Sequence, residues 1–352
     1  MNDCIHLGNH SISNRDGTFI IAEMSGNHNM DFNRAVKILE AAKDAGADAI
    51  KIQTYTADTI TLDCDDACFQ ITQGTLWDGT TLHKLYEKAY TPWEWQPKLQ
   101  KIANDLGMDF FSSPFDFTSV DFLERMDVPA YKIASFEITD IPLIRKVAKL
   151  GKPVIISTGI ATLADIELAV NTCKDAGNDD VILLKCCSAY PTPYEDINLR
   201  TMVNLADTFD CIVGLSDHTM GDTVAVASVA MGAKVVEKHL TLSRSDGGVD
   251  SAFSMEPEEF KQMVDHIRIV EKAMGKVTYA LSDKQKGERE HARSLFIAQD
   301  MKAGDRLNES NMRSVRPANG LHTKYYDKLL GKRINKDVKL GTPLSWDLID
   351  NE

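Results

Sequence analysis

The sequence has no long hydrophobic run, few cysteines and no excess of positive charge. No apolar stretch approaches the ~18 residues of a membrane span, and no signal-peptide core is visible, so we expect a cytoplasmic protein without membrane contacts. Seven cysteines in 352 residues are too sparse for a disulfide scaffold, and reduced thiols are expected. The net charge of -13 argues against nucleic-acid binding, which usually needs a basic face.

Two common cofactor motifs are also absent. Cys64 and Cys68 have no second Cys or His pair nearby, so a structural zinc site is not expected. No GxGxxG segment follows the first apolar run, which leaves a dinucleotide-binding fold without support. The hydrophobic fraction of 43% and the charged fraction of 26% are typical of a soluble globular enzyme.

Eight short apolar runs divide the first 240 residues, and each leads to a polar or charged residue. Helical stretches between several runs stop at a glycine, which adopts the left-handed conformation at low cost (Gly46, Gly107, Gly151, Gly177 and Gly232). This repeated unit favours a (β/α)8 TIM barrel, in which the chemistry lies at the C-terminal strand ends. The expected strands are 19–22, 49–50, 109–111, 131–134, 154–156, 181–184, 212–215 and 235–236.

The repeat is interrupted once and then ends. Nearly forty residues separate Gln53 from Pro92, and this insertion is read as a lid or substrate-contacting segment, with a packing collar or subunit contact as the alternative. We expect a barrel domain over 1–280, a polar linker over 281–290 and a small domain of short strands and turns over 291–352. A core that small would need support from a partner surface.

Cationic and hydroxyl side chains gather at the expected strand ends. Lysine is unfavourable when buried without a partner, so several lysines on one rim of an acidic protein point to an anionic ligand such as a phosphate or carboxylate. The alternative is a set of ion pairs with Glu23, Glu137 and Glu237. The lysines are Lys51, Lys132, Lys185 and Lys238, and the neighbouring hydroxyls are Ser113, Ser135, Ser157, Ser188 and Ser216.

His218 and His239 follow the seventh and eighth expected strands, so their rings can converge. Two imidazoles with water or substrate oxygens make a divalent metal site that is incomplete by the rules for zinc, and a structural role is the alternative. His28 is a third candidate. Glu23 could act as a base or stabilise a positive transition state, and Asp250 follows two glycines that would let it reach the barrel mouth.

Together these tips resemble the sialic acid synthases. The resemblance rests on AEMSGNHN (22–29), KIQT (51–54), SPFD (113–116), YKIAS (131–135), STG (157–159), YPTP (190–193), GLSDHT (214–219) and EKH (237–239). The tail, with RSL (293–295) and RPANG (316–320), resembles their antifreeze-like (SAF) domain. Within the family, GTLWDG (74–79) and TPWEW (91–95) are similar to the pseudaminic acid branch.

The resemblance implies a condensation of phosphoenolpyruvate with 2,4-diacetamido-2,4,6-trideoxy-L-altrose, in which water is consumed and phosphate leaves. An N-acetylneuraminate or legionaminate synthase, acting on a different N-acetylated sugar, is the alternative. It further implies a domain-swapped homodimer and a divalent ion of the Mn, Mg or Co type on His218 and His239. Phosphoenolpyruvate would be held by Lys51, Ser113, Lys132, Ser135, Ser157, Ser188 and Ser216, and the acceptor sugar by Glu23, Glu137, Tyr190, Asp250 and the partner subunit's Arg316.

The chain departs from the family pattern at Ser188, where the neuraminate branch has asparagine, and at Ala318, where glycine is usual. Other classes remain open at this point. A Schiff-base aldolase would use one barrel lysine as its nucleophile. A non-catalytic sugar-binding protein is disfavoured because the whole set of strand tips is present.

Overall fold

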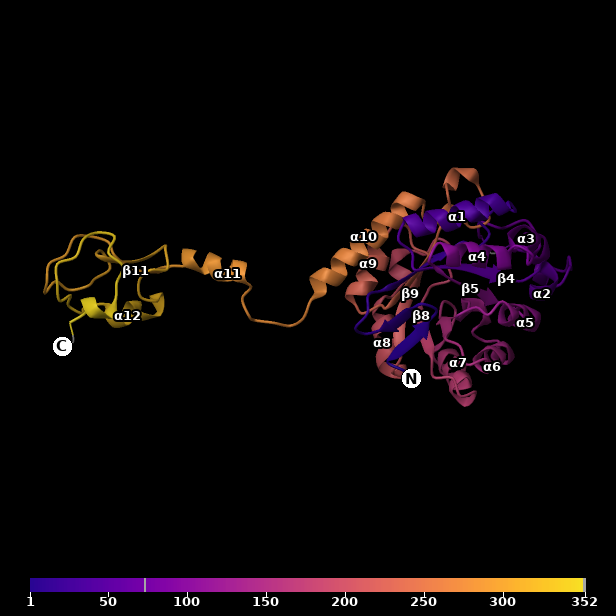
Figure 1. Cartoon of the computed structure of the whole chain (residues 1–352), viewed down its shortest axis with the longest axis horizontal. Coiled ribbons are helices and arrows are strands. Elements are labelled where there is room, and N and C mark those ends of the chain that lie inside the picture. The colour runs from indigo at the N-terminus through magenta and orange to yellow at the C-terminus, as the bar shows by residue number, and fades with distance from the viewer. Residues whose placement is uncertain (73, 351–352) are drawn as a thin grey trace. The chain divides into compact units, whose positions relative to one another are not determined.

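The protein has two compact units, Met1–Gly275 and Lys276–Glu352. The structure is a computed structural model that describes residues 1–72 and 74–350 (Figure 1). Among these residues, no helix has both the length and the hydrophobicity that crossing a membrane would require.

Eight parallel strands form a closed barrel in the first unit, in the order β10-β3-β4-β5-β6-β7-β8-β9. The predicted barrel is therefore confirmed, and most strands extend past their apolar runs to include the polar tips. Register pairs Glu23 with both Lys51 and His239, which places these three residues at one level. The strands are β3 (Phe19–Glu23), β4 (Ala49–Thr54), β5 (Asp109–Pro114), β6 (Tyr131–Ile133), β7 (Val154–Ser157), β8 (Val181–Lys185), β9 (Ile212–Asp217) and β10 (Val235–His239).

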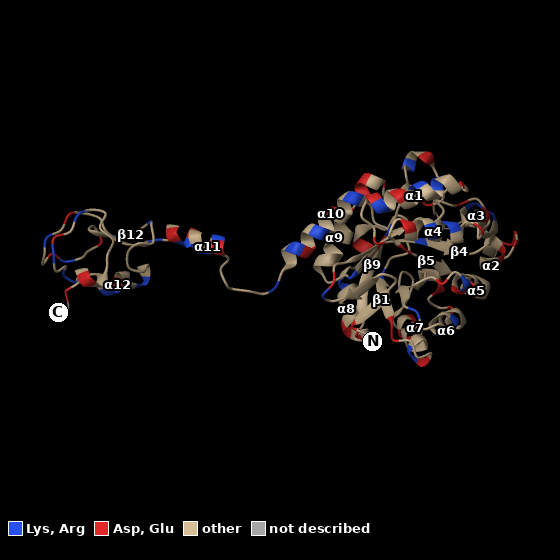
Figure 2. Ribbon diagram, in the orientation of Figure 1, with Lys and Arg blue, Asp and Glu red and all other residues tan. Residues whose placement is uncertain are grey.

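Helices surround the barrel, and much of the charge-coloured ribbon in this unit belongs to them (Figure 2). The five glycines expected to stop helices all have positive φ, between 71° and 104°, as predicted. α10 follows the last strand and packs against α1 and α9. These helices are α1 (Phe32–Asp44), α4 (Gln96–Asp105), α5 (Phe117–Arg125), α6 (Ile141–Ala148), α7 (Leu163–Asp175), α8 (Arg200–Phe209), α9 (Thr223–Ala230) and α10 (Pro257–Met274).

An N-terminal hairpin that the sequence analysis did not predict packs at the N-terminal ends of the strands. It consists of β1 (Cys4–Leu7) and β2 (His10–Ser13), and it buries Ile5, Leu7 and Ile12 completely. His10 Nδ1 lies 2.7 Å from Asp109 Oδ2 at the start of β5. The hairpin therefore covers the end of the barrel opposite the polar tips.

The insertion after β4 contains α2 (Ala57–Ile60), the short 3-10 helix η1 (Ala67–Phe69) and α3 (Leu82–Ala89). α2 and α3 contact each other, and a bridge joins Gln70 to Thr81 just before α3. Residue 73 lies outside the described residues. The insertion is therefore a small helical layer and not an extended loop.

The second unit has its own small core around the antiparallel pair β11 (Ser294–Ile297) and β12 (Met312–Val315). Leu295, Ile297 and Met312 from these strands pack with Ile334 and Leu344. The segment 281–290, expected to be a linker, contains α11 (Asp283–Glu288) and the start of η6 (Arg289–His291). The remaining elements are η7 (Thr323–Tyr325), α12 (Tyr326–Leu329) and η8 (Trp346–Leu348).

Candidate active site

Two lysines and two glutamates form a buried charged cluster at the C-terminal end of the barrel. Lys51 Nζ lies 2.8 Å from Glu23 Oε2 and 3.5 Å from Glu237 Oε1. Lys132 Nζ lies 4.0 Å from the same Glu237 oxygen. All four side chains are at most 5% exposed. The predicted cationic site and its ion-pair alternative thus occur together, with Glu23 and Glu237 as the partners.

The other two tip lysines are turned away from this cluster. Side chains alternate along a strand, so Glu237 and His239 share one face of β10 and Lys238 takes the other. Lys238 Nζ is 2.6 Å from Asp217 Oδ2 and is fully buried. Lys185 Nζ donates to the Cys186 carbonyl oxygen at 2.7 Å. Only Lys51 and Lys132, of the four lysines predicted at the rim, are available to an anion in the barrel centre.

Burial sets the protonation preferences of this cluster. It raises the pKa of Glu23, and the neighbouring Glu237 raises it further against the opposing effect of Lys51. Burial likewise lowers the pKa of Lys132. Protonation of Glu23 would leave the cluster with a net positive charge. The Lys51 ammonium, 2.8 Å from Glu23 Oε2, opposes this protonation and favours the charged carboxylate.

Serine hydroxyls surround the lysines and glutamates. Lys132 Nζ donates to Ser157 Oγ at 2.6 Å, and Lys51 Nζ donates to Ser113 Oγ at 3.4 Å. Ser216 Oγ donates to Glu237 Oε1 at 3.0 Å. The predicted hydroxyls at these three strand ends are therefore brought to one place.

Ser135 and Ser188 lie beside Gly159, just after β7. The Gly159 backbone N–H donates to Ser135 Oγ at 3.1 Å. A Cβ at Gly159 would stand 2.2 Å from Ser188 Oγ and 2.6 Å from Ser135 Oγ, so only glycine leaves room for both hydroxyls. Both serines line the cavity described below.

The rings of His218 and His239 converge, with centroids 5.3 Å apart. His218 Nδ1 lies 3.1 Å from the Cys187 carbonyl oxygen, so Nδ1 carries a proton. Burial lowers the pKa of His218, but the neighbouring Cys186 outweighs that effect and raises it. His239 Nδ1 is buried without a hydrogen-bond partner among the described residues. Burial, reinforced by the charge of His218, lowers the pKa of His239 well below its usual value, so its imidazole is neutral at pH 7.

This pair fits a divalent cation only in part. Imidazole is a good ligand in its neutral form, which His239 has and which His218 would adopt on binding the ion. No group of three His, Cys, Asp or Glu side chains suited to a metal occurs in the part of the chain that the structure describes. Substrate or water oxygens would have to complete the coordination. His28, the third candidate, is not part of this pair, because it packs against Trp95 and lies 3.2 Å from Thr91 Oγ1.

Aromatic side chains fix the two histidine rings. The Tyr190 ring lies 4.4 Å from that of His218, and the Phe253 ring lies 5.0 Å from that of His239. Trp77, from the insertion, contacts Tyr190 at 5.7 Å and donates its indole N–H to the Val249 carbonyl oxygen at 2.9 Å. The insertion is thereby joined to the loop after β10.

A cavity of about 760 Å³ opens above the charged cluster. Polar residues from strand ends and the loops that follow them line it, among them Ser25, Gln53, Ser135, Glu137, Ser188, His239 and Asp250. Glu137 Oε2 is buried without a hydrogen-bond partner among the described residues, and burial raises the pKa of Glu137 to about 7. Tyr190 also lines the cavity, as do residues of the insertion.

A hydrogen-bond chain that sequence reasoning missed connects the charged cluster of Lys51, Lys132, Glu23 and Glu237, the floor of the cavity, to the loops at the cavity mouth. Gln53 Nε2 donates to Glu23 Oε1 at 3.1 Å and to Ser25 Oγ at 3.0 Å, and Ser25 donates to Asp250 Oδ2. Burial raises the pKa of Asp250, although Ser25 opposes the effect. Gln53 was visible as a strand tip, but Ser25 gave no signal because its partner lies 225 residues away.

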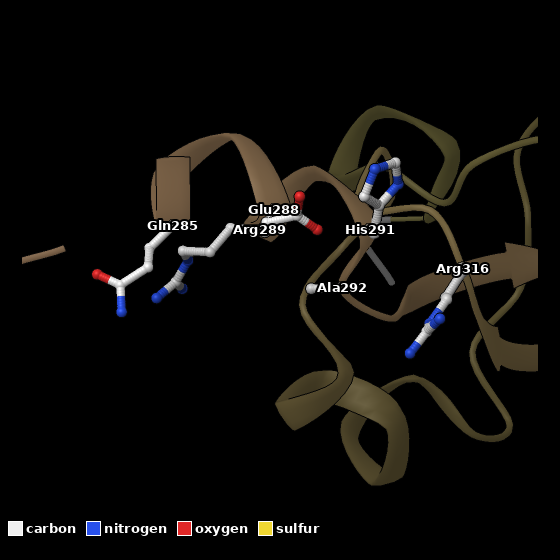
Figure 3. A pocket seen from close by; sticks show the side chains of 6 residues that line it. All are labelled: Gln285, Glu288, Arg289, His291, Ala292 and Arg316. Carbon is white, nitrogen blue, oxygen red and sulfur yellow. The ribbon is translucent and has the colours of Figure 1, made fainter. Parts of the chain in front are cut away.

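The predicted site residues thus fall into three groups. Ser135, Glu137, Ser188, Tyr190, His239 and Asp250 line the cavity. The others from the barrel lie buried below it: Glu23, Lys51, Ser113, Lys132, Ser157, Ser216 and His218. Arg316 belongs to the second unit, directly after β12, where it is exposed in a shallow pocket of about 480 Å³ near Arg289 and His291 (Figure 3).

Comparisons with known proteins show the family of the chain. A model of the NeuB family matches residues 38–279, and a model of the SAF domain matches residues 292–350. The pseudaminic acid synthase of Campylobacter jejuni is 46% identical over 97% of this chain and 98% of its own length. The N,N'-diacetyllegionaminic acid synthase of the same species is 39% identical over 92% of this chain and 97% of its own.

A solved structure gives the same result at the level of the fold. The crystal structure of N-acetylneuraminic acid synthetase from Leptospira borgpetersenii, in complex with citrate, has a TM-score of 0.72 and 31% identity. The match covers 82% of this chain and 95% of that one.

Proposed function

The chain belongs to the NeuB family, and from that premise we propose that it is a pseudaminic acid synthase. It would condense phosphoenolpyruvate with 2,4-diacetamido-2,4,6-trideoxy-L-altrose and water, giving pseudaminic acid and phosphate. The single observation that carries the proposal is the convergence of Lys51, Lys132, His218 and His239 at one end of the barrel, beneath one cavity. This set offers two cations for an anion and two imidazoles for a metal.

Phosphoenolpyruvate would bind in the charged cluster. It carries a phosphate and a carboxylate, and both accept many hydrogen bonds. Lys51 and Lys132 would supply charge-assisted donors, and the hydroxyls of Ser113, Ser135, Ser157, Ser188 and Ser216 would supply neutral ones. The lysines would exchange their present carboxylate partners for the ligand, and burial would keep water from competing.

His218 and His239 would hold a divalent ion of the Mn, Mg or Co type. When bound, the ion would polarise the aldehyde of the open-chain acceptor as a Lewis acid. The protein's own contribution is orientation. The Cys187 carbonyl fixes the tautomer of His218, and Tyr190 and Phe253 hold the two rings.

The reaction would form one carbon–carbon bond and one carbon–oxygen bond, and it would break one carbon–oxygen bond. C3 of phosphoenolpyruvate adds to the aldehyde carbon, whose oxygen takes up a proton, and positive charge develops at C2. Glu23, positioned by Gln53 and Lys51, would face C2 and stabilise that charge. Water then adds to C2 and loses a proton, and the bond between C2 and the phosphate oxygen breaks. Phosphate leaves, the new hydroxyl loses its proton, and C2 becomes a ketone carbon.

The acceptor sugar would lie in the cavity against Glu137, Tyr190 and Asp250. All three line it, and Glu137 Oε2 is without a hydrogen-bond partner among the described residues. Sugar hydroxyl and amide groups are donors that this carboxylate can accept. The floor would therefore bind the anion and the loops above it would bind the sugar.

We further propose a domain-swapped homodimer, in which the partner subunit's Arg316 faces the acceptor. Large apolar side chains stand exposed, by 39% to 60%, after five consecutive strands from β5 to β9. Such a patch around a mouth marks an interaction surface, and a second unit with a small core suits it. The same proposal places the enzyme in the cytoplasm, where phosphoenolpyruvate is available. The rim residues are Phe117, Phe136, Ile160, Leu163, Tyr194 and Met220.

Product analysis tests the proposed function. The protein is mixed with phosphoenolpyruvate, Mn²⁺ and one sugar at a time: the diacetamido-trideoxy-L-altrose, its stereoisomers or N-acetylmannosamine. We expect mass spectrometry to show a nine-carbon acid, with equal phosphate release, from the L-altrose sugar, and chelator to stop both. Turnover restricted to another sugar would contradict the proposal. Inactivation by borohydride with pyruvate would instead indicate a Schiff-base aldolase.

A further inference from the structure

Helix α3 turns an apolar face toward the substrate cavity and not toward the barrel core. Leu82, Leu85, Tyr86 and Ala89 all line the cavity, at the i, i+3, i+4, i+7 spacing that places residues on one helix face. Three residues on the other side, Lys84, Glu87 and Lys88, are exposed. The helix is therefore amphipathic, and the surface that its apolar face meets is the cavity.

The rest of the insertion extends this apolar surface. Ile60 from α2 and Ile71 also line the cavity, and Ile71 is only 5% exposed. Gln70 and Thr75 are polar members of the same lining, but the α3 face itself offers a single polar group, the Tyr86 hydroxyl. We call the surface formed by Ile60, Ile71, Leu82 and Leu85 the apolar wall.

The two sides of the cavity differ in chemistry. The strand ends supply carboxylate, amide, imidazole and hydroxyl groups, whereas the insertion supplies mainly aliphatic and aromatic side chains. An acceptor whose aldehyde end faces His239 must direct its other end away from the strand ends. A group at that far end is then recognised by contact with hydrocarbon.

We infer that the apolar wall binds the methyl group at C6 of the acceptor and selects a 6-deoxy sugar over its 6-hydroxy counterpart. This inference rests on the proposed function. A methyl group against Leu82 and Leu85 buries hydrocarbon and gives up no hydrogen bond to water. A hydroxyl group in the same place gives up its hydrogen bonds to water. A hydrophobic pocket rejects an added hydroxyl by roughly 10- to 100-fold in kcat/KM.

The test compares two acceptors that differ at one atom: 2,4-diacetamido-2,4,6-trideoxy-L-altrose and 2,4-diacetamido-2,4-dideoxy-L-altrose. The selectivity is the ratio of their kcat/KM values, measured by phosphate release with saturating phosphoenolpyruvate and Mn²⁺. In Leu85→Asn, we expect the ratio to fall by about tenfold, because an amide replaces hydrocarbon at the contact. Leu76→Asn is the matched control, since Leu76 lies in the same insertion, is 54% exposed and does not line the cavity.

The outcomes separate the two proposals. If the unmodified protein turns over neither acceptor, the proposed function fails. If it turns over the deoxy sugar, but Leu85→Asn leaves the ratio as Leu76→Asn does, the apolar wall does not select the methyl group and the inference is wrong. Leu82→Asn, one turn earlier on the same face, gives the same readout if circular dichroism shows Leu85→Asn to be unfolded.

Discussion

The floor of the cavity and its mouth are built differently. The floor residues lie on neighbouring strands, and Lys51, Lys132, Glu23 and Glu237 are paired with one another. The mouth residues lie on the loops after the strands and on the insertion. In the loop after β6, Glu137 has a buried oxygen without a hydrogen-bond partner among the described residues. In the insertion, α3 lines the cavity with apolar side chains. Under the proposed function, the floor would carry the chemistry and the mouth would choose the sugar.

The largest effect is expected from removing a side chain at the floor that the reaction needs but the fold does not. His239→Ala should lower turnover by at least about a thousandfold, because the second imidazole of the proposed metal pair is lost. It should leave the far-UV circular dichroism unchanged. His6→Ala, an exposed histidine on β1 at the other end of the barrel, is the control. Near-normal phosphate release by the unmodified protein in metal-depleted buffer would contradict the proposed metal site.

The mouth should be completed by the second subunit. Arg316→Ala should lower kcat/KM by about a hundredfold while the dimer persists, because the loss of a charge-assisted contact costs several kcal/mol. Mixing Arg316→Ala with His239→Ala should then restore partial activity, because a mixed dimer has one site with an intact barrel and an intact tail. If fully exchanged mixtures remain as inactive as either parent, Arg316 does not act in the neighbouring subunit.

The anion site gives a smaller effect. Lys51→Met or Lys132→Met keeps the side-chain stem and removes the charge. Because a hydrogen bond to a charged group contributes about 1.5–3 kcal/mol, kcat/KM for phosphoenolpyruvate should fall roughly 10- to 100-fold. Lys185→Met is the matched control, since Lys185 bonds the Cys186 carbonyl instead. Unchanged kinetic parameters in both variants would return the two lysines to a purely structural role.

The environment of Glu137 at the cavity mouth can be tested through the pH dependence of the free energy of unfolding. Burial raises its pKa to about 7 from a usual 4.5, so the unfolded chain loses this proton first. Stability should therefore fall as pH rises from 4.5 to 7. The difference corresponds to about 3 kcal/mol at most. Glu137→Gln should remove this loss, so urea unfolding should show it more stable than the unmodified protein at pH 8 but not at pH 4.5. An equal difference at both pH values, or the same behaviour in exposed Glu167→Gln, would contradict the assignment.

The barrel could be predicted because its signal is repeated. Eight apolar runs and five stop glycines each report one local unit, and all of them appear in the structure. The N-terminal hairpin escaped prediction because its strands are only four residues long and β1 alternates exposed and buried positions. α3 escaped for a related reason. Its apolar stripe spans two turns within a segment that reads as a loop.

The sequence identified side chains that gather at this end of the barrel, but not how each one is oriented. The sequence made Lys51, Lys132, Lys185 and Lys238 equal candidates. A lysine at the end of a strand does not reveal which face of the sheet its side chain occupies. Register decides this, by setting Glu237 toward the centre and Lys238 toward Asp217. The Gln53–Ser25–Asp250 chain depends on contacts between distant segments, which no local pattern reports.

The most direct test of the division between floor and mouth is a crossed measurement on two variants. Lys51→Met and Leu85→Asn are each assayed for the KM of phosphoenolpyruvate and for the ratio of kcat/KM between the 6-deoxy and 6-hydroxy acceptors. The account predicts that Lys51→Met changes the parameters for phosphoenolpyruvate and leaves the acceptor ratio unchanged, whereas Leu85→Asn does the reverse. If each variant changes both quantities to the same degree, the floor and the mouth do not have separate roles.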